Sequence, residues 1–155
     1  MNRGKVLVEV TTRGGPHAGA SSAVMRRRAE KMLRARGLTG VELSVALVDD
    51  ATIRELNKKH RKKDKPTDVL SFPLLELAPP GDDARGALGD VIVSVPTARR
   101  QASRRRRPLL DELTMLLAHG LLHLLGYDHR DDDEERVMNE ATRALERAAN
   151  ARGAA

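Results

Sequence analysis

The sequence predicts an α/β (α+β) fold: one compact domain in which a small mixed sheet of four strands packs with about five helices. Apolar and polar residues alternate at positions 41–47, which is typical of a strand with one buried face. Residues 109–125 are apolar on nearly every side, which predicts a helix buried at the centre of the domain. The predicted elements follow the order β-α-β-α-β-β-α-α-α, which favours a mixed sheet covered by helices.

The first half of the domain begins with a strand at residues 5–10 and a loop at about 11–22, rich in glycine, serine and threonine. Ser22 can cap a helix over residues 22–36. We expect four residues of this helix to face the core: Val24, Ala29, Met32 and Leu33.

A short helix follows the strand at 41–47 and is capped by Asp50 or Thr52. It leads into a basic loop at residues 61–66. A short strand at 69–72 and a surface excursion at 74–87, which contains Pro-Pro-Gly, come next.

The second half continues with a strand at 88–95 and a basic helix at 97–107. The apolar helix at 109–125 follows, and a last helix runs to about residue 149. We expect the last helix to turn four residues inward: Val137, Met138, Ala141 and Leu145. Residues 151–155 form a frayed tail.

The whole-chain properties favour one soluble domain, residues 1–155. The sequence has no apolar run of about 18 residues and no signal peptide, so we expect a cytoplasmic protein that does not enter a membrane. Cysteine is absent, which excludes disulfides and thiolate ligands.

The charge balance is basic, with 28 Lys and Arg against 22 Asp and Glu, a net +6. This excess suits a polyanionic partner such as RNA, and ordinary solubility charge explains it equally well. Only two aromatic residues, Phe72 and Tyr127, are present, which argues against a platform for stacking bases.

Three of the five histidines lie within residues 117–129. His119 and His123 are four residues apart, so on a helix they share one face. Gly126 allows the chain to leave the helix and return His129 as a third ligand. Three imidazoles fit one zinc ion per chain and leave a fourth position open, as in catalytic sites. The alternative is two satisfied core histidines with a third on a loop.

The spacing of these ligands matches that of the HExxHxxGxxH zinc proteases, with one difference. Those enzymes carry a glutamate directly after the first histidine as general base, and this chain has Gly120 there. The ligand set without the base argues against peptide hydrolysis by that mechanism.

The sequence at this point resembles the YbeY proteins, bacterial zinc-dependent endoribonucleases. Three segments in the family's order carry the resemblance: residues 119–129 (His-Gly-Leu-Leu-His-Leu-Leu-Gly-Tyr-Asp-His), residues 56–73, which end in Asp-Val-Leu-Ser-Phe-Pro, and residues 88–94 (Leu-Gly-Asp-Val-Ile-Val-Ser). It extends over roughly residues 41–145. One departure is His60, where the family usually has tyrosine.

The resemblance implies a single-strand-specific, zinc-dependent endoribonuclease that acts in maturation of the 16S ribosomal RNA 3′ end and in ribosome quality control. It implies ribosomal RNA and the small ribosomal subunit as partners, and also a small-subunit ribosomal protein and a ribosome-assembly GTPase. Two alternatives stay open: a non-catalytic assembly factor with a structural metal, and another zinc hydrolase.

Arg61 and His119 are the expected catalytic residues. Zinc lowers the pKa of its water to about 7, and the resulting hydroxide could attack the phosphodiester or activate the RNA 2′-hydroxyl. Arg61, in a loop resembling the family's functional arginine segment, would stabilise charge on the phosphoryl oxygens. Asp128 is either a partner for a ligand histidine N–H or a turn-forming residue. We expect Asp68 and Asp90 to be hydrogen-bond acceptors, and no residue stands out as general base.

Two basic runs are candidates for RNA binding, with a solvated charged surface as the alternative. They comprise Lys62, Lys63 and Lys65 in the first run and Arg104, Arg105, Arg106 and Arg107 in the second.

Overall fold

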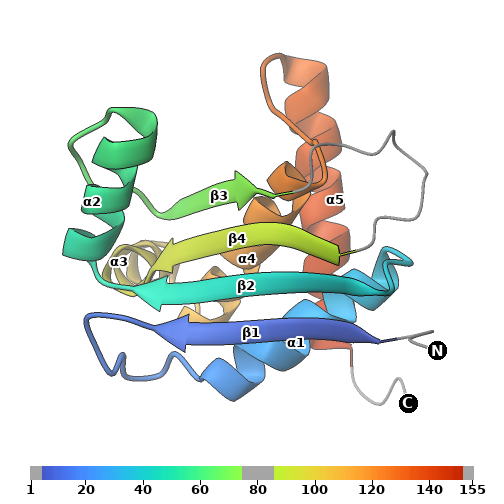
Figure 1. Ribbon diagram of the computed structural model, residues 1–155, viewed down its shortest axis with the longest axis horizontal. Helices are drawn as coiled ribbons and strands as arrows, with labels where there is room; N and C mark the ends of the chain where they lie inside the picture. The colour runs from blue at the N-terminus through green and yellow to red at the C-terminus, as the bar shows by residue number, and fades with distance from the viewer. Residues whose placement is uncertain (1–4, 75–85, 152–155) are drawn as a thin grey trace.

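The structure, a computed structural model, describes residues 5–74 and 86–151, and there it has four strands and five helices. Their order along the chain is the predicted one (Figure 1), so the expected fold class is confirmed. The elements are β1 (Val6–Thr12), α1 (Ser22–Ala35), β2 (Val41–Val48), α2 (Asp50–Arg61), β3 (Val69–Pro73), β4 (Gly86–Ser94), α3 (Val95–Arg105), α4 (Leu109–Leu124) and α5 (Asp132–Asn150).

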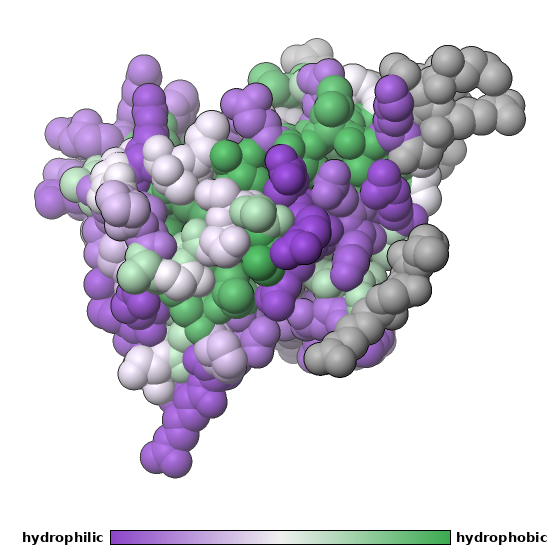
Figure 2. Space-filling view, turned by 90° about the horizontal axis from the view of Figure 1, so that it is seen from below, coloured by the Kyte–Doolittle hydropathy of each residue, from purple (hydrophilic) through white to green (hydrophobic). Residues whose placement is uncertain are grey.

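The four strands form one mixed sheet in the order β1-β2-β4-β3. β1 and β2 run parallel, β2 and β4 run parallel, and β3 is antiparallel to β4. β1 and β3 are therefore the two edges of the sheet, and Figure 2 looks at the molecule from the side of β1.

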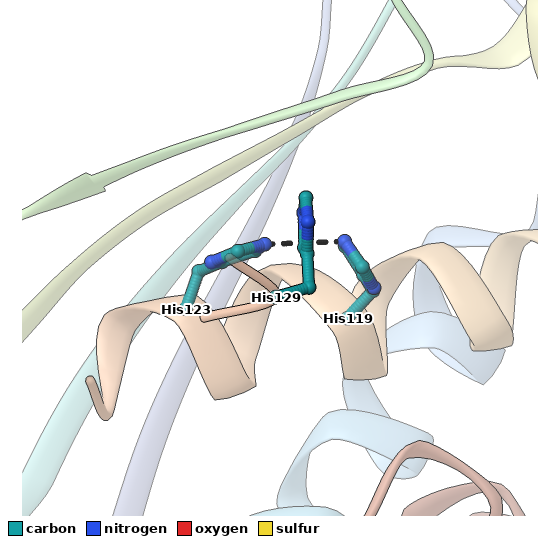
Figure 3. Close-up of side chains that lie close together, drawn as sticks. All are labelled: His119, His123 and His129. Atoms are coloured by element: carbon teal, nitrogen blue, oxygen red, sulfur yellow. Dashed lines mark hydrogen bonds between the residues drawn. The ribbon is translucent and has the colours of Figure 1, made fainter. Parts of the chain in front are cut away.

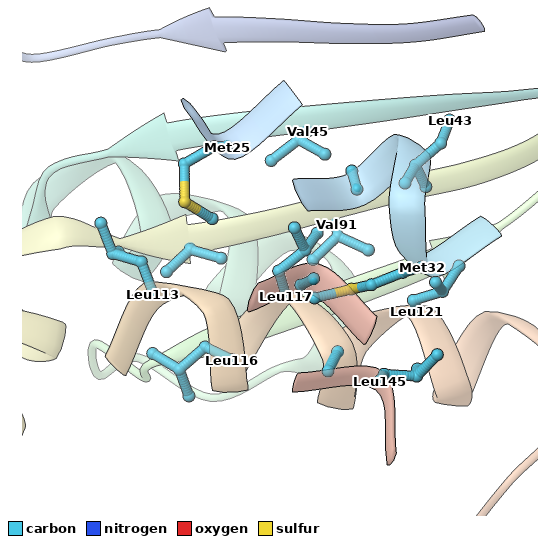
Figure 4. Packing of buried hydrophobic residues seen from close by; sticks show 14 of the residues in the cluster. Met25, Met32, Leu43, Val45, Val91, Leu113, Leu116, Leu117, Leu121 and Leu145 are labelled. Carbon is cyan, nitrogen blue, oxygen red and sulfur yellow. The ribbon is translucent and has the colours of Figure 1, made fainter. Parts of the chain in front are cut away.

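The two faces of the sheet are covered unequally. α1 and α4 pack on one face and α5 packs against these two helices, whereas α2 covers only one end of the other face (Figure 1). The main core lies between the sheet and α1, α4 and α5, and it includes Met25, Met32, Leu43, Val91, Leu117 and Leu145 (Figure 4). A smaller core under α2 consists of Val48, Ile53, Leu70 and Ile92. None of the helices in the described ranges combines the length and the hydrophobicity that a membrane-spanning segment needs.

α4 is the buried central helix that the sequence predicts. Ten of its residues are buried, on several sides of the helix. One of them is charged: Glu112 is fully buried and forms ion pairs with Arg107 at 2.8 Å and with Arg105 at 3.1 Å. Because a buried carboxylate needs a paired cation, these contacts hold α3's C-terminal end against α4.

Two predicted helix caps are wrong by one or more residues. Ser21, not Ser22, caps α1 by accepting a hydrogen bond from the backbone N–H of Val24. Asp49, rather than Asp50 or Thr52, caps α2 by accepting from Thr52. In each case the neighbouring residue could also serve as a cap, so propensity alone does not distinguish them.

Other boundaries also differ from the predictions. β1 continues to Thr12, because it stays paired with β2, so the loop begins later than residue 11. β4 already begins at Gly86 and ends at Ser94, whose side chain caps α3. Pro96 is therefore in the first turn of α3, where its missing N–H costs nothing. α3 ends at Arg105 because Arg106 adopts a left-handed conformation.

The inward faces of the outer helices are rotated slightly from the predicted ones. Met25 rather than Val24 is fully buried in α1. Val137 in α5 is 46% exposed, and Thr142 lies inward instead. Most of the predicted excursion (75–85) and of the frayed tail (152–155) lies outside the described residues.

Candidate metal centre

Two of the predicted ligands, His119 and His123, project from the same face of α4. Their Nε2 atoms are 3.1 Å apart (Figure 3). Two imidazole nitrogens bound tetrahedrally to one zinc ion at 2.0–2.1 Å would be about 3.3 Å apart. The helix alone therefore brings two ligands to nearly the separation that a metal requires.

The third ligand arrives through a turn that Gly126 makes possible. Gly126 has a φ of +97°, which residues with a Cβ rarely adopt. The N–H of Tyr127 donates to Leu122 and that of Gly126 donates to His123, which is the hydrogen-bond pattern of a Schellman motif. The chain reverses direction there and returns His129 to the helix, so that all three ligand nitrogens lie within 4.8 Å of one another.

Partial burial favours the neutral form of two of the ligand histidines, His119 and His123. It lowers the pKa of His119 below its usual range, and charge on His123 would lower it further. Burial likewise lowers the pKa of His123, against the opposing effect of a hydrogen bond to the backbone of Tyr127. Because only a neutral imidazole has a lone pair to donate, both side chains are ready to bind metal at neutral pH.

The three imidazoles fit a divalent transition metal such as zinc in donor type and in spacing. Among the described residues, they are the one group of three or more histidine and carboxylate side chains close enough to hold an ion. Three protein ligands leave a coordination position for water or substrate, which distinguishes catalytic from structural zinc sites.

Gly120 is required by packing. A Cβ at this position would lie 2.6 Å from Cγ1 of Val91 and 3.1 Å from Oγ of Ser71. Ser71 Oγ instead donates to the carbonyl of Gly120 at 2.9 Å, which joins β3 to the ligand helix. The position that carries the general base in zinc proteases thus faces the sheet, where a glutamate side chain has no room.

Arg61 lies near His123, and it is the last residue of α2 and not part of a loop. Its Nη2 donates to the carbonyl of Ser71 at 3.0 Å, and its guanidinium is 5.8 Å from the centre of the Phe72 ring. The positive charge of Arg61 contributes to the lowered pKa of His123. A helix end and a strand therefore fix the arginine beside the candidate metal centre.

Comparisons with known proteins agree with this site. A family model described as "Endoribonuclease YbeY" matches residues 18–150. Relatives of that name include an Aquifex aeolicus protein, 53% identical over 69% of each chain, and an Anaeromyxobacter dehalogenans protein, 46% identical over 90% of this chain and 70% of its own. The chain belongs to the endoribonuclease YbeY family.

Membership in the YbeY family confirms the expected enzyme class, a nuclease that hydrolyses RNA. The fold agrees as well. A solution structure of a Thermotoga maritima protein superposes with a TM-score of 0.63, at 28% identity, over 92% of this chain and 89% of that one.

The residue that departs from the YbeY pattern, His60, packs where an aromatic ring is expected. Its imidazole lies 4.9 Å, centre to centre, from the ring of Phe72. Phe72 thus contacts His60 on α2 and lies near the neighbouring Arg61. The sequence did not indicate this contact, because it joins α2 to a strand ten or more residues away.

The acidic candidates have different partners. Asp128 accepts the backbone N–H of His129 at 2.8 Å and pairs with Arg130, contacts that correspond to the turn-forming alternative. Asp68 accepts from Gln101 at 3.2 Å and from the backbone of Val69, as expected of a hydrogen-bond acceptor. The charge of Asp68 also opposes the lowering of the His119 pKa, an effect that could not be predicted from residues 51 positions apart in the sequence.

The two basic runs differ in how much of their charge is available. Lys62, Lys63 and Lys65 form an exposed turn after α2, ordered by backbone hydrogen bonds to Lys58, Asn57 and Lys63. In the second run, Arg105 and Arg107 are paired with Glu112, whereas Arg104 and Arg106 are exposed and have no ion-pair partner among the described residues.

Proposed function

We propose that the protein is a zinc-dependent endoribonuclease that cleaves single-stranded RNA, matures the 3′ end of 16S ribosomal RNA and acts in ribosome quality control. The observation that supports this proposal is the convergence of three imidazoles with the Arg61 guanidinium, held by Ser71, near His123. Hydrolysis of a phosphodiester accumulates negative charge on the phosphoryl oxygens, and a preorganised cation stabilises that charge.

The residues of the site have separate roles in this proposal. His119, His123 and His129 would hold the zinc ion, which lowers the pKa of bound water and so supplies a nucleophile near neutral pH. His119 and Arg61 are the proposed catalytic residues. Arg61 uses one N–H to bind Ser71, so its other N–H groups can bind two phosphoryl oxygens at once.

The decisive experiment compares cleavage of matched single-stranded and double-stranded RNA by nuclease-free, zinc-loaded protein and two variants. We expect cleavage of the single strand only, and none with His123→Ala. We expect Arg61→Lys to keep its zinc and its RNA affinity but to cleave about 10²-fold more slowly, because an ammonium lacks the fork geometry of guanidinium. Unchanged cleavage in the lysine variant would remove Arg61 from the active site.

The same experiment distinguishes the non-catalytic alternative. An assembly factor with a structural metal would bind RNA, lose stability in His123→Ala and cleave neither substrate. Another zinc hydrolase would leave RNA intact and act on a different substrate.

RNA binding is proposed for the residues of both basic runs that are exposed and form no ion pair among the described residues: Lys62, Lys63, Lys65, Arg104 and Arg106. Each phosphate contact contributes about −0.7 to the slope of log affinity against log salt for a single strand. Replacing Arg104 and Arg106 by alanine should reduce the slope. Replacing Arg105 and Arg107, which face Glu112, should mainly lower stability, so that this second pair is the matched control.

The proposed setting is the cytoplasm, with the small ribosomal subunit as the principal partner. A small-subunit ribosomal protein and a ribosome-assembly GTPase are the further partners we propose. Co-sedimentation of the purified protein with small subunits, followed by crosslinking, tests these assignments. Absence of the protein from the small-subunit fraction would contradict them.

A further inference from the structure

The outer edge of β1 is open in the described part of the chain. The backbone hydrogen bonds between β1 and β2 show which N–H and C=O groups of β1 face outward. The carbonyl of Lys5 accepts from Gly40, and the N–H of Arg13 donates to Leu47, so odd-numbered residues of β1 turn their backbone groups toward β2. Because backbone direction alternates along a strand, the even-numbered residues, such as Val8 and Val10, present their N–H and C=O groups outward.

A groove of ≈ 710 Å³ runs along this edge. It is lined by β1, by the adjoining part of β2 and by the first turns of α1. Leu7, one of its lining residues, is 61% exposed. Seen from the β1 side, the surface shows a hydrophobic area bordered by hydrophilic side chains (Figure 2).

The side chains along the groove differ on its two sides. On the open face of the sheet, Glu9 and Glu42 are exposed and have no ion-pair partner among the described residues. On the side of the helices, the groove is lined by Val8, Val10 and Ala23, with Arg26 at its border. An acidic side and an aliphatic side therefore flank one row of unpaired backbone groups.

We propose that the free edge of β1 binds an extended segment of a partner protein as an added strand. Strand addition gives affinity through main-chain hydrogen bonds and specificity through alternate side chains. A strand placed beside β1 would turn every second side chain toward Glu9 and the others toward Val8 and Val10. The segment that fits is one in which lysine or arginine alternates with aliphatic residues.

This docking edge is separate from the candidate metal centre. β1 and β3 are opposite edges of the sheet, and Arg61 and Ser71 place the metal centre next to β3. A partner strand on β1 therefore leaves access to the histidines unchanged, and the basal cleavage rate should not depend on residues of this edge.

The test uses the full chain and a labelled peptide, acetyl-Lys-Val-Lys-Val-Lys-Val-Lys-amide, followed by fluorescence anisotropy. The control peptide has the same composition in two blocks, four lysines followed by three valines. We expect the alternating peptide to bind at least about tenfold more tightly than the control, because only alternation satisfies both sides of the groove. Equal binding of the two peptides would overturn the proposal.

Protein variants locate the binding site. Val8→Pro removes an outward N–H without removing a bond to β2, a substitution that edge strands tolerate, and it should abolish binding. Glu9→Lys, which does not disturb the core, should weaken binding at least about tenfold. Glu140→Lys on α5 makes the same change of charge elsewhere and should have no effect.

Two other occupants would give different results. A monomer–dimer equilibrium of the peptide-free protein that Val8→Pro abolishes would assign the edge to a second copy of this chain. Weaker binding of a single-stranded RNA oligonucleotide by Val8→Pro would assign it to RNA. Either result overturns the proposal of a partner-protein strand.

Discussion

Replacing Gly120 by alanine tests how closely the ligand helix packs on the sheet. The added methyl group would lie 2.6 Å from Cγ1 of Val91, which is fully buried and cannot move into solvent. Overpacking of this kind costs about 3 kcal/mol at the upper end, and the higher helix propensity of alanine returns about 1 kcal/mol. The expected net loss is about 2 kcal/mol, or a fall in Tm of about 4–8 °C for a chain of this size.

Urea denaturation of the two single variants and the double variant shows whether the contact with Val91 is the cause. Val91→Ala alone should destabilise by leaving a cavity. In the double variant, the methyl group at position 120 occupies part of that cavity, so the combined loss should be smaller than the sum by about 1 kcal/mol or more. Losses that add to within about 0.5 kcal/mol would refute the steric explanation.

Three further predictions concern the metal and two carboxylates, the buried Glu112 and the partly buried Glu146. Chelation should lower Tm, because a metal that binds the native state more tightly than the unfolded chain stabilises it, and His123→Ala should remove this response in a thermal-shift assay. Glu112→Gln removes the carboxylate that Arg105 and Arg107 share, and it should cost about 1.5–3 kcal/mol in urea denaturation because both arginines still reach solvent; a loss below about 1 kcal/mol would contradict the pairing. Burial raises the pKa of Glu146, and the negative charges of Asp111 and Glu112 raise it further. The native state therefore binds the Glu146 proton more tightly than the unfolded chain does. The stability that this proton provides is lost as the pH rises from the pKa of Glu146 in the unfolded chain through its raised pKa in the native state. Glu146→Gln should therefore raise Tm at pH 7 and have little effect at pH 4, and a stabilisation that persists equally at pH 4 would contradict this sign.

The grouping of the three histidines was predictable because its determinants are local. The spacing of His119 and His123 and the conformational freedom of Gly126 are properties of eleven consecutive residues. The role of Gly120 was not predictable in the same way. Its lack of a side chain argued against a protease, but the reason for it is contact with Val91, a residue on a strand far away in sequence.

Boundaries and partners depended on tertiary context. The pairs Ser21 and Ser22, and Asp49 and Asp50, offer equivalent caps, and the packing of each helix decides between them. The order of the strands in the sheet likewise depends on which strands pair with one another, so no single segment of the sequence determines it. The pairing of Arg105 and Arg107 with Glu112 divides a uniform arginine run into residues that form ion pairs and residues that form none among the described residues, which no composition argument could anticipate.

The closeness of the three histidine ligands in the sequence has a consequence for the unfolded chain. Because residues 119–129 contain the whole ligand set, an unfolded chain can still gather the three imidazoles around an ion by forming two helical turns and a reversal. Metals that bind the unfolded chain stabilise the native state by less than their affinity implies. During synthesis, an ion bound by these three imidazoles would order the end of the central helix as soon as this segment emerges, before α5 is made.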